Sequence, residues 1–212
     1  MYLKKIFLLL FFILNFKLNS EPIEINVTDG KIEPLPIAVT KFNYLSSKEK
    51  QLSISILEVI KNNLNNSGLF KTISRKAFLQ NEEEIFLQPV FGDWRLIDAN
   101  LIVSGEIKNN NGVLNIRIKL WDVYREKLIL SKKISGVPSK KWRLLSHLIS
   151  NMVYERVTGE KGYFDTKIVY VAEEGSFKNK KRRIAMMDYD GQNHKFLTDG
   201  KDLVLTPRFS PD

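Results

Sequence analysis

The sequence predicts a chain of two parts: an α/β domain with one mixed sheet and two helices, followed by the first strands of an all-β repeat. Apolar residues recur at helical spacing near residues 46–64 and 139–153. Between and around these stretches lie segments in which apolar and polar residues alternate, as they do in half-buried strands. Beyond Gly162, short strands and regular turns replace the helical spacing. One sheet covered by two helices completes a small domain, so we place the α/β domain at residues 35–162 and the repeat at 163–212.

Residues 1–20 have the pattern of a secretory signal peptide. Lys4 and Lys5 precede an apolar run from Ile6 to Phe16. A helix of that length spans about 16 Å, well short of the roughly 30 Å hydrocarbon core of a bilayer. Cleavage after Ser20 would leave Glu21 as the mature N-terminus. An uncleaved anchor is the alternative, because Leu18 is bulkier than the residue usual near such a cleavage site. Export to a bacterial-type cell envelope is the expectation.

Composition excludes some classes of function. The chain has no cysteine, which excludes disulfides, thiol nucleophiles and Cys-ligated metals. Its formal net charge is +9, and loss of the signal peptide lowers it to about +6. That balance permits anionic partners such as nucleic acid or acidic membrane surfaces without requiring them. The basic run at 178–183 could meet such partners, but export and the absence of an aromatic platform favour a solvated hairpin loop.

Residues 21–34 form a candidate detachable arm. Ile23, Ile25 and Val27 alternate with polar residues before a turn at 29–30, which predicts a short strand. Pro34 and Pro36 follow and cannot donate to a ladder, so they separate this strand from the next one at 37–39.

The α/β domain begins its first helix with a capping box. Ser46 and Glu49 have the required spacing, and Gly68 ends the helix. Short strands are expected at 69–73, 101–103, 114–120 and 128–134, with a short helical stretch at 93–98. The second helix begins near Ser139 and ends at Gly159. We expect the three tryptophans to be core residues of this domain.

The repeat supplies about one unit. Strands are expected at 168–171, 184–187 and 196–198, with a tight turn at Asp190-Gly191. Repeat architectures need several units to bury their faces, and the chain stops within its last turn, so we interpret it as a fragment.

The sequence lacks the familiar catalytic and metal-binding patterns. His147 and His194 have no partner at metal-ligand spacing, and the sequence has neither a nucleophile elbow nor a phosphate-binding loop. Residues 188–191 resemble part of a calcium loop but lack its distal Glu, so a β-turn is expected. Residues 82–84 are three consecutive glutamates, which are typical of a solvated loop rather than a paired-carboxylate site. We therefore expect no catalytic, cofactor-binding or metal-binding residues.

Four stretches resemble the TolB family, the periplasmic component of the Tol–Pal envelope system. They are Phe91-Gly92-Asp93-Trp94 leading to Val103-Ser104-Gly105, Thr158 to Phe164 with Ile168 to Val171, Asp188-Tyr189-Asp190-Gly191, and Pro207 to Asp212. They occur in the family's order over nearly all of the mature chain. The fourth lacks the glycine that closes the family's repeated motif, and most of the family's propeller is missing.

The resemblance implies a fold and a function. The α/β domain would be anticodon-binding-like in fold, and the repeat would be the first blade of a truncated six-bladed β-propeller. The protein would be a non-enzymatic periplasmic adaptor, peripheral to membranes and without nucleic-acid partners, that supports outer-membrane integrity and invagination during division. A TolA-like inner-membrane protein would bind the arm, and a Pal-like lipoprotein would bind the propeller.

An extended arm with alternating apolar residues suits addition to the edge of a partner's sheet. The candidate partner-binding residues are Glu21, Ile23, Glu24, Ile25, Asn26, Val27, Asp29 and Gly30. The alternative is that this strand pairs only within its own domain. Two rival functions are the N-terminal part of a propeller-containing peptidase of the prolyl-oligopeptidase type and a basic module that binds anionic ligands.

Overall fold

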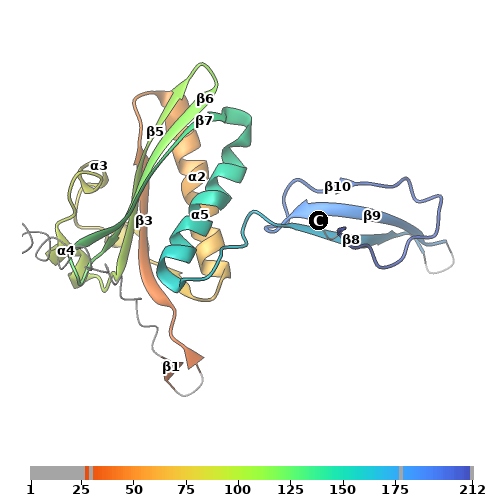
Figure 1. Ribbon diagram of the computed structural model, residues 1–212, viewed down its shortest axis with the longest axis horizontal. Coiled ribbons are helices and arrows are strands. Elements are labelled where there is room, and N and C mark those ends of the chain that lie inside the picture. The colour runs from red at the N-terminus through yellow and green to blue at the C-terminus, as the bar shows by residue number, and fades with distance from the viewer. Residues whose placement is uncertain (1–26, 29–30, 177–178, 211–212) are drawn as a thin grey trace, which may run out of the picture.

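The computed structural model describes residues 27–28, 31–176 and 179–210, and the expected signal peptide lies outside them. The described chain forms a five-stranded sheet with helices on both faces and a separate three-stranded sheet, joined by one linker (Figure 1). The strands are β1 (Val27–Thr28), β2 (Lys31–Ile32), β3 (Leu35–Asn43), β4 (Phe70–Thr72), β5 (Leu101–Asn110), β6 (Val113–Asp122), β7 (Lys127–Pro138), β8 (Lys167–Glu174), β9 (Lys181–Asp188) and β10 (Lys195–Phe196). The α-helices are α2 (Ser47–Asn66), α3 (Glu82–Ile85), α4 (Phe91–Leu96) and α5 (Trp142–Thr158).

The larger sheet is mixed, with strand order β4-β3-β5-β6-β7. β3 pairs in parallel with β4 and β5, while β5, β6 and β7 form an antiparallel meander. The parallel β3–β4 pair requires a crossover connection, and α2 supplies it. The prediction of a mixed sheet with two main helices, followed by strands of a second sheet, is confirmed.

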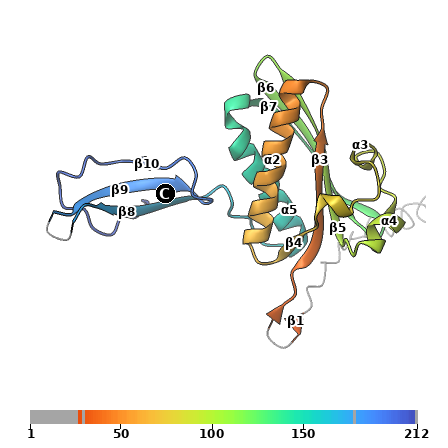
Figure 2. The same ribbon diagram turned by 180° about the vertical axis from the view of Figure 1, so that it is seen from behind.

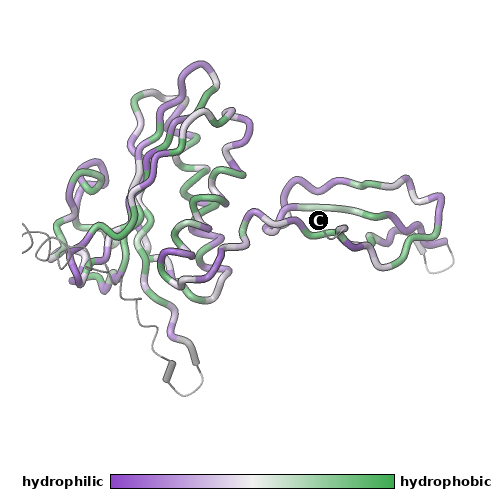
Figure 3. Tube along the Cα trace, in the orientation of Figure 1, coloured by the Kyte–Doolittle hydropathy of each residue, from purple (hydrophilic) through white to green (hydrophobic). Residues whose placement is uncertain are grey.

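Both faces of the large sheet are covered. α2 and α5 lie on one face and α3 and α4 on the other, as the two opposite views show (Figures 1 and 2). The larger core, on the side of the long helices, includes Ile56, Ile60, Leu64, Leu145 and Ile149. The smaller core on the other side includes Ile85, Phe91, Trp94, Ile102 and Trp121. In Figure 3 the hydrophobic and hydrophilic colours alternate along the long helices and the strands, and the tip of the β5–β6 hairpin is hydrophilic.

The capping box predicted from the sequence is present at the start of α2. The Ser46 side chain accepts from the Glu49 N–H, and the Glu49 carboxylate accepts from the Ser46 N–H at 2.9 Å. The other carboxylate oxygen of Glu49 accepts from the Asn109 N–H at 2.6 Å, so the cap also holds the β5–β6 hairpin. Burial alone would raise the pKa of Glu49, but the N–H groups of Asn109, Leu45 and Ser46 outweigh burial and hold that pKa below its ordinary value.

Two predictions about the α/β domain need correction. The three glutamates expected in a solvated loop form the short helix α3, because the Asn81 side chain accepts from the Glu83 N–H and caps its start. Trp94 and Trp121 are buried as expected, but both belong to the smaller core. Trp142 is only partly buried, because it is the first residue of α5 at the rim of the larger core.

The smaller sheet has strand order β10-β9-β8 and is antiparallel throughout. The expected tight turn lies after β9, where the Gly191 N–H donates to the Asp188 carbonyl at 2.9 Å. Gly191 has φ = +80°, a conformation that glycine adopts without steric cost. In the described part of the chain no helix combines the length and apolar character needed to cross a membrane.

Candidate partner-binding site

The described part of the arm forms two antiparallel strands, each two residues long. Val27 pairs with Ile32 and Thr28 with Lys31, so β1 and β2 flank the turn expected at 29–30. This two-stranded sheet is separate from the five-stranded one, and Figure 1 shows it projecting beyond the start of β3. Of the predicted partner-binding residues only Val27 is described. Glu21, Ile23, Glu24, Ile25, Asn26, Asp29 and Gly30 lie outside the described residues, so their role stays a prediction.

The linker after α5 is fixed to that helix before it enters the smaller sheet. The Asn151 side chain accepts from the Phe164 N–H at 2.9 Å and donates to Asp165 at 2.8 Å. Gly162 passes so close that a Cβ there would lie 2.5 Å from Asn151. Phe164 is fully buried in the larger core. The path from the first sheet to the second is therefore set by specific contacts.

Four aromatic rings gather at this junction. Tyr154 of α5, Tyr163 and Phe164 of the linker, and Tyr189 of the turn after β9 lie with ring centroids 4.8–5.9 Å apart in successive pairs. Edge-to-face contacts predominate, the geometry that the ring quadrupoles favour. Burial, followed by the hydrogen bond with Tyr189, raises the pKa of Tyr163 to about 12.

A charged group joins α5 to the same turn. Arg143 forms an ion pair with Asp190, and Lys167 forms one with Asp188. His147 is buried, and its Nε2 lies 3.5 Å from an Asp190 carboxylate oxygen. Its Nδ1 lies 2.9 Å from Asn63 Nδ2, which can only donate, so the neutral ring carries its proton on Nε2.

The pKa of His147 follows from these neighbours. Burial lowers it, the Asp190 carboxylate raises it, and the Arg143 guanidinium lowers it again, so that it lies below its ordinary value. The histidine is therefore neutral near pH 7. Its ring fills the space between α5 and the turn while Asn63 of α2 fixes its orientation.

Sequence reasoning missed this cluster. Ligand atoms of His147, Asp188 and Asp190 lie within 4.8 Å of one another, which is close enough for a shared cation. Arg143 and Lys167, however, already neutralise the two carboxylates, so the group has no excess negative charge to attract a divalent ion. The cluster therefore acts as a structural contact that holds α5 to the turn after β9. Arg143 and Asp190 are 47 residues apart in the sequence, so only the fold reveals that they meet.

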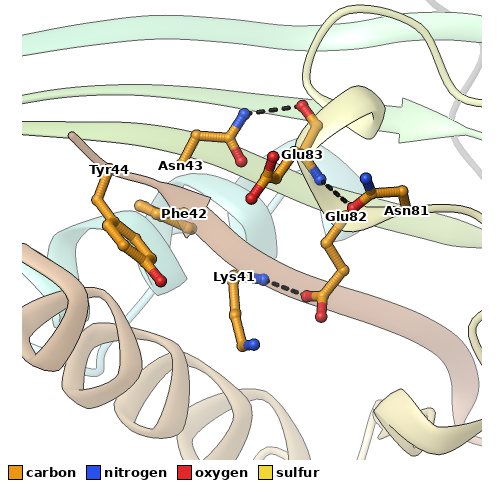
Figure 4. A pocket seen from close by; sticks show the side chains of 7 residues that line it. All are labelled: Lys41, Phe42, Asn43, Tyr44, Asn81, Glu82 and Glu83. Atoms are coloured by element: carbon orange, nitrogen blue, oxygen red, sulfur yellow. Dashed lines mark hydrogen bonds between the residues drawn. The ribbon is translucent and has the colours of Figure 1, made fainter.

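A second polar group lines a pocket between the end of β3 and the start of α3 (Figure 4). The Lys41 N–H donates to Glu82 Oε2 at 2.7 Å, and the Asn43 side chain donates to the Glu83 carbonyl at 2.9 Å. Arg75 also pairs with Glu82. Glu82 thus satisfies backbone and side-chain donors of its own chain. None of the seven lining residues is a histidine, serine or cysteine, so the pocket has no Ser–His or Cys–His pair.

Part of the basic run is paired within its own hairpin, where three of its cations share two carboxylates. Lys180 and Arg182 of the run pair with Glu173, and Arg183 pairs with Glu174. The Arg183 guanidinium also lies 3.4 Å above the Phe196 ring. Residues 181–183 belong to strand β9, so the run lies partly in a strand and not only in the expected hairpin loop.

Comparison with known proteins identifies the family. Residues 23–129 match the family model of the TolB amino-terminal domain, and residues 154–212 match that of the TolB beta propeller domain. The chain belongs to the TolB family. The resemblance stated from the sequence motifs is confirmed, and the smaller sheet is the start of a propeller.

Curated relatives agree. A Tol-Pal system protein TolB from Rickettsia prowazekii is 47% identical over 205 residues, covering 95% of this chain and 46% of its own length. One from Paramagnetospirillum magneticum is 45% identical over 190 residues, covering 89% of this chain and 42% of its own. The chain thus spans less than half the length of these relatives. The crystal structure of TolB from Acinetobacter baumannii shares the fold, with a TM-score of 0.71 at 23% identity, over 82% of this chain and 41% of that one.

Proposed function

We propose that this protein is a periplasmic adaptor of the Tol–Pal system, without enzymatic activity, that supports outer-membrane integrity and invagination at division. Membership of the TolB family carries the proposal, because the curated relatives are named as Tol-Pal system proteins. The signal-peptide pattern of residues 1–20 supports delivery to the periplasm. We place the arm at 21–34, the α/β domain at 35–162 and the first blade at 163–212.

The arm is the proposed contact for a TolA-like inner-membrane protein. β1 and β2 form a sheet of their own, so the arm is not tied to the five-stranded sheet by the strand pairing of its described residues. A short strand with alternating apolar residues can add to a partner's sheet edge through main-chain hydrogen bonds. A Pal-like lipoprotein would bind the completed propeller of the longer protein.

A binding experiment with purified partner tests the arm. The mature chain and a version lacking residues 21–33 are titrated against the TolA-like protein of the same organism by calorimetry. We expect binding to the mature chain and its loss on deletion. Ile25→Asp should weaken binding because it places a charge on the apolar face of the strand. Thr28→Asp adds the same charge on the opposite face, at a residue outside the predicted set, and should change binding little. Equal binding by the deleted form would show that the arm is not the contact.

A further inference from the structure

β7 is the long open edge of the five-stranded sheet. It pairs with β6 on one side, and among the described residues no strand pairs with its other side. The opposite edge is closed differently: β4 is three residues long, and beyond it the Lys41 N–H of β3 donates to the Glu82 carboxylate of α3. An open edge carries unpaired N–H and C=O groups that can pair with an added strand.

A groove lies beside this edge. Its volume is about 440 Å³, and its lining residues are Leu130 and Lys132 of β7 with Met152, Glu155, Arg156, Val157 and Gly159 at the end of α5. Leu130 pairs with Leu120, a core residue beneath the long helices, so the groove opens on the helix-covered face. Alternate side chains of a strand added to β7 would point to that same face and enter the groove.

The end of α5 is anchored to the strand that would receive the addition. Arg156 Nε donates to the Ile129 carbonyl at 2.6 Å, which joins helix and strand at the groove. The register of β7 against β6 shifts between Leu128 and Leu130, and farther along Gly136 has φ = +78° and Pro138 lacks an N–H, so regular pairing is confined to residues 130–134. That length suits a strand of ordinary size.

The charge of the edge selects its partner. β7 contains Lys127, Lys132 and Lys133 and no acidic residue. Arg156 adds a positive charge in the groove, where Glu155 is the one acidic lining residue. Lysines on an edge oppose pairing with a like-charged strand, which disfavours a second copy of β7 and favours an acidic one.

We infer that the β7 edge and its groove form a docking site for an extended segment of another protein in which apolar and acidic residues alternate. The inference goes beyond the proposed function, in which this chain donates a strand through its arm. At β7, by contrast, the chain receives a strand from another protein.

A pair of labelled peptides tests the site, one alternating Val and Glu and one alternating Val and Lys, titrated by fluorescence anisotropy into the mature chain. We expect the Val–Glu peptide to bind and the Val–Lys peptide to bind at least tenfold more weakly. Amide exchange should slow within 130–134 when the Val–Glu peptide is present. Lys132→Glu should weaken binding about tenfold, since it replaces an attraction by a repulsion. Lys71→Glu, the same change on the opposite edge, should leave binding unaltered.

Several results would overturn the inference. The inference is wrong if both peptides bind equally, or if Lys132→Glu and Lys71→Glu weaken binding equally. It is also wrong if the peptide slows amide exchange in β8 or β10 and not in β7. Absence of binding at millimolar peptide would have the same meaning. A version lacking residues 21–33 separates this site from the arm. Unchanged binding supports a partner's strand as the occupant, whereas binding that appears only after the deletion would show that the arm itself covers β7.

Discussion

Substitution of Asp190 by Asn tests whether the turn after β9 is held to α5 by charge. The side chain of Asp190 is 10% exposed and that of Arg143 is 23% exposed. Exposed ion pairs contribute up to about 1 kcal/mol, and breaking a buried one costs about 3–5 kcal/mol. This pair lies between those limits, so we expect Asp190→Asn to lower the free energy of unfolding by about 2 kcal/mol at pH 7.5.

The same substitution changes the response to acid. Because the pKa of His147 in the folded chain is lowered, the unfolded chain binds more protons, and stability falls as pH drops below the ordinary histidine value of about 6.5. The Asp190 carboxylate raises the pKa of His147, so its neutralisation lowers that pKa further. In the variant, the loss of stability on acidification should therefore continue to lower pH than in the parent chain.

Urea unfolding followed by circular dichroism at pH 7.5 and at steps down to pH 5 measures both effects. Asp202→Asn is the matched control, since Asp202 is exposed on the same part of the chain. If the two variants differ by less than about 0.5 kcal/mol at pH 7.5, the range of ordinary surface substitutions, the ion pair does not hold the junction.

Three further substitutions address the α/β domain and the linker. The lowered pKa of Glu49 means that its contribution is present above the ordinary value of 4.5 and lost as pH falls through the folded value, so Glu49→Gln should cost about 2 kcal/mol at pH 7 and progressively less as the pH of the urea titration is lowered below 4.5. A Cβ on Gly105 would meet a backbone oxygen and an aromatic ring at 2.9 Å, so Gly105→Ala should lower the free energy of unfolding by about 1–3 kcal/mol and with it the melting temperature. Gly92→Ala places its Cβ in open space and should lower neither. In urea unfolding, Phe164→Ala should lower the free energy of unfolding by about 3–5 kcal/mol, because Phe164 is fully buried. Phe209→Ala changes an exposed residue and should lower it by almost nothing, so similar losses in the two variants would contradict the assigned packing.

Local signals in the sequence predicted the elements well. The capping box at Ser46 and the glycine after Thr158 act within one or two turns of chain, and both form the expected helix ends. Alternation located the strands but underestimated β3 and β5, because strands buried on both faces lose the alternating pattern. Strand order could not be read from the sequence, since alternation does not reveal which strands are neighbours.

The contacts that organise the candidate site are long-range. Asp190 meets Arg143 and His147 because the linker is held against α5 at Gly162 and Phe164, and no local pattern records that path. A histidine beside an apolar stripe gave the one available hint. The resemblance to a family supplied the rest, because motif order over the whole chain carries information that no single stretch holds.

The larger sheet controls where strand addition can occur. At one side, the Glu82 carboxylate accepts the Lys41 N–H and so takes the place that a neighbouring strand would fill. At the other side, β7 is long, but its lysines oppose pairing with like-charged strands. The two-stranded sheet of the arm is separate from the five-stranded sheet and Pro34 lies between them, but Pro36, which was expected to separate them as well, is part of β3 and pairs with Lys71. Under the proposed strand exchange, the lysines of β7 guard against a second copy of this chain, whereas they do not oppose an acidic strand from a partner.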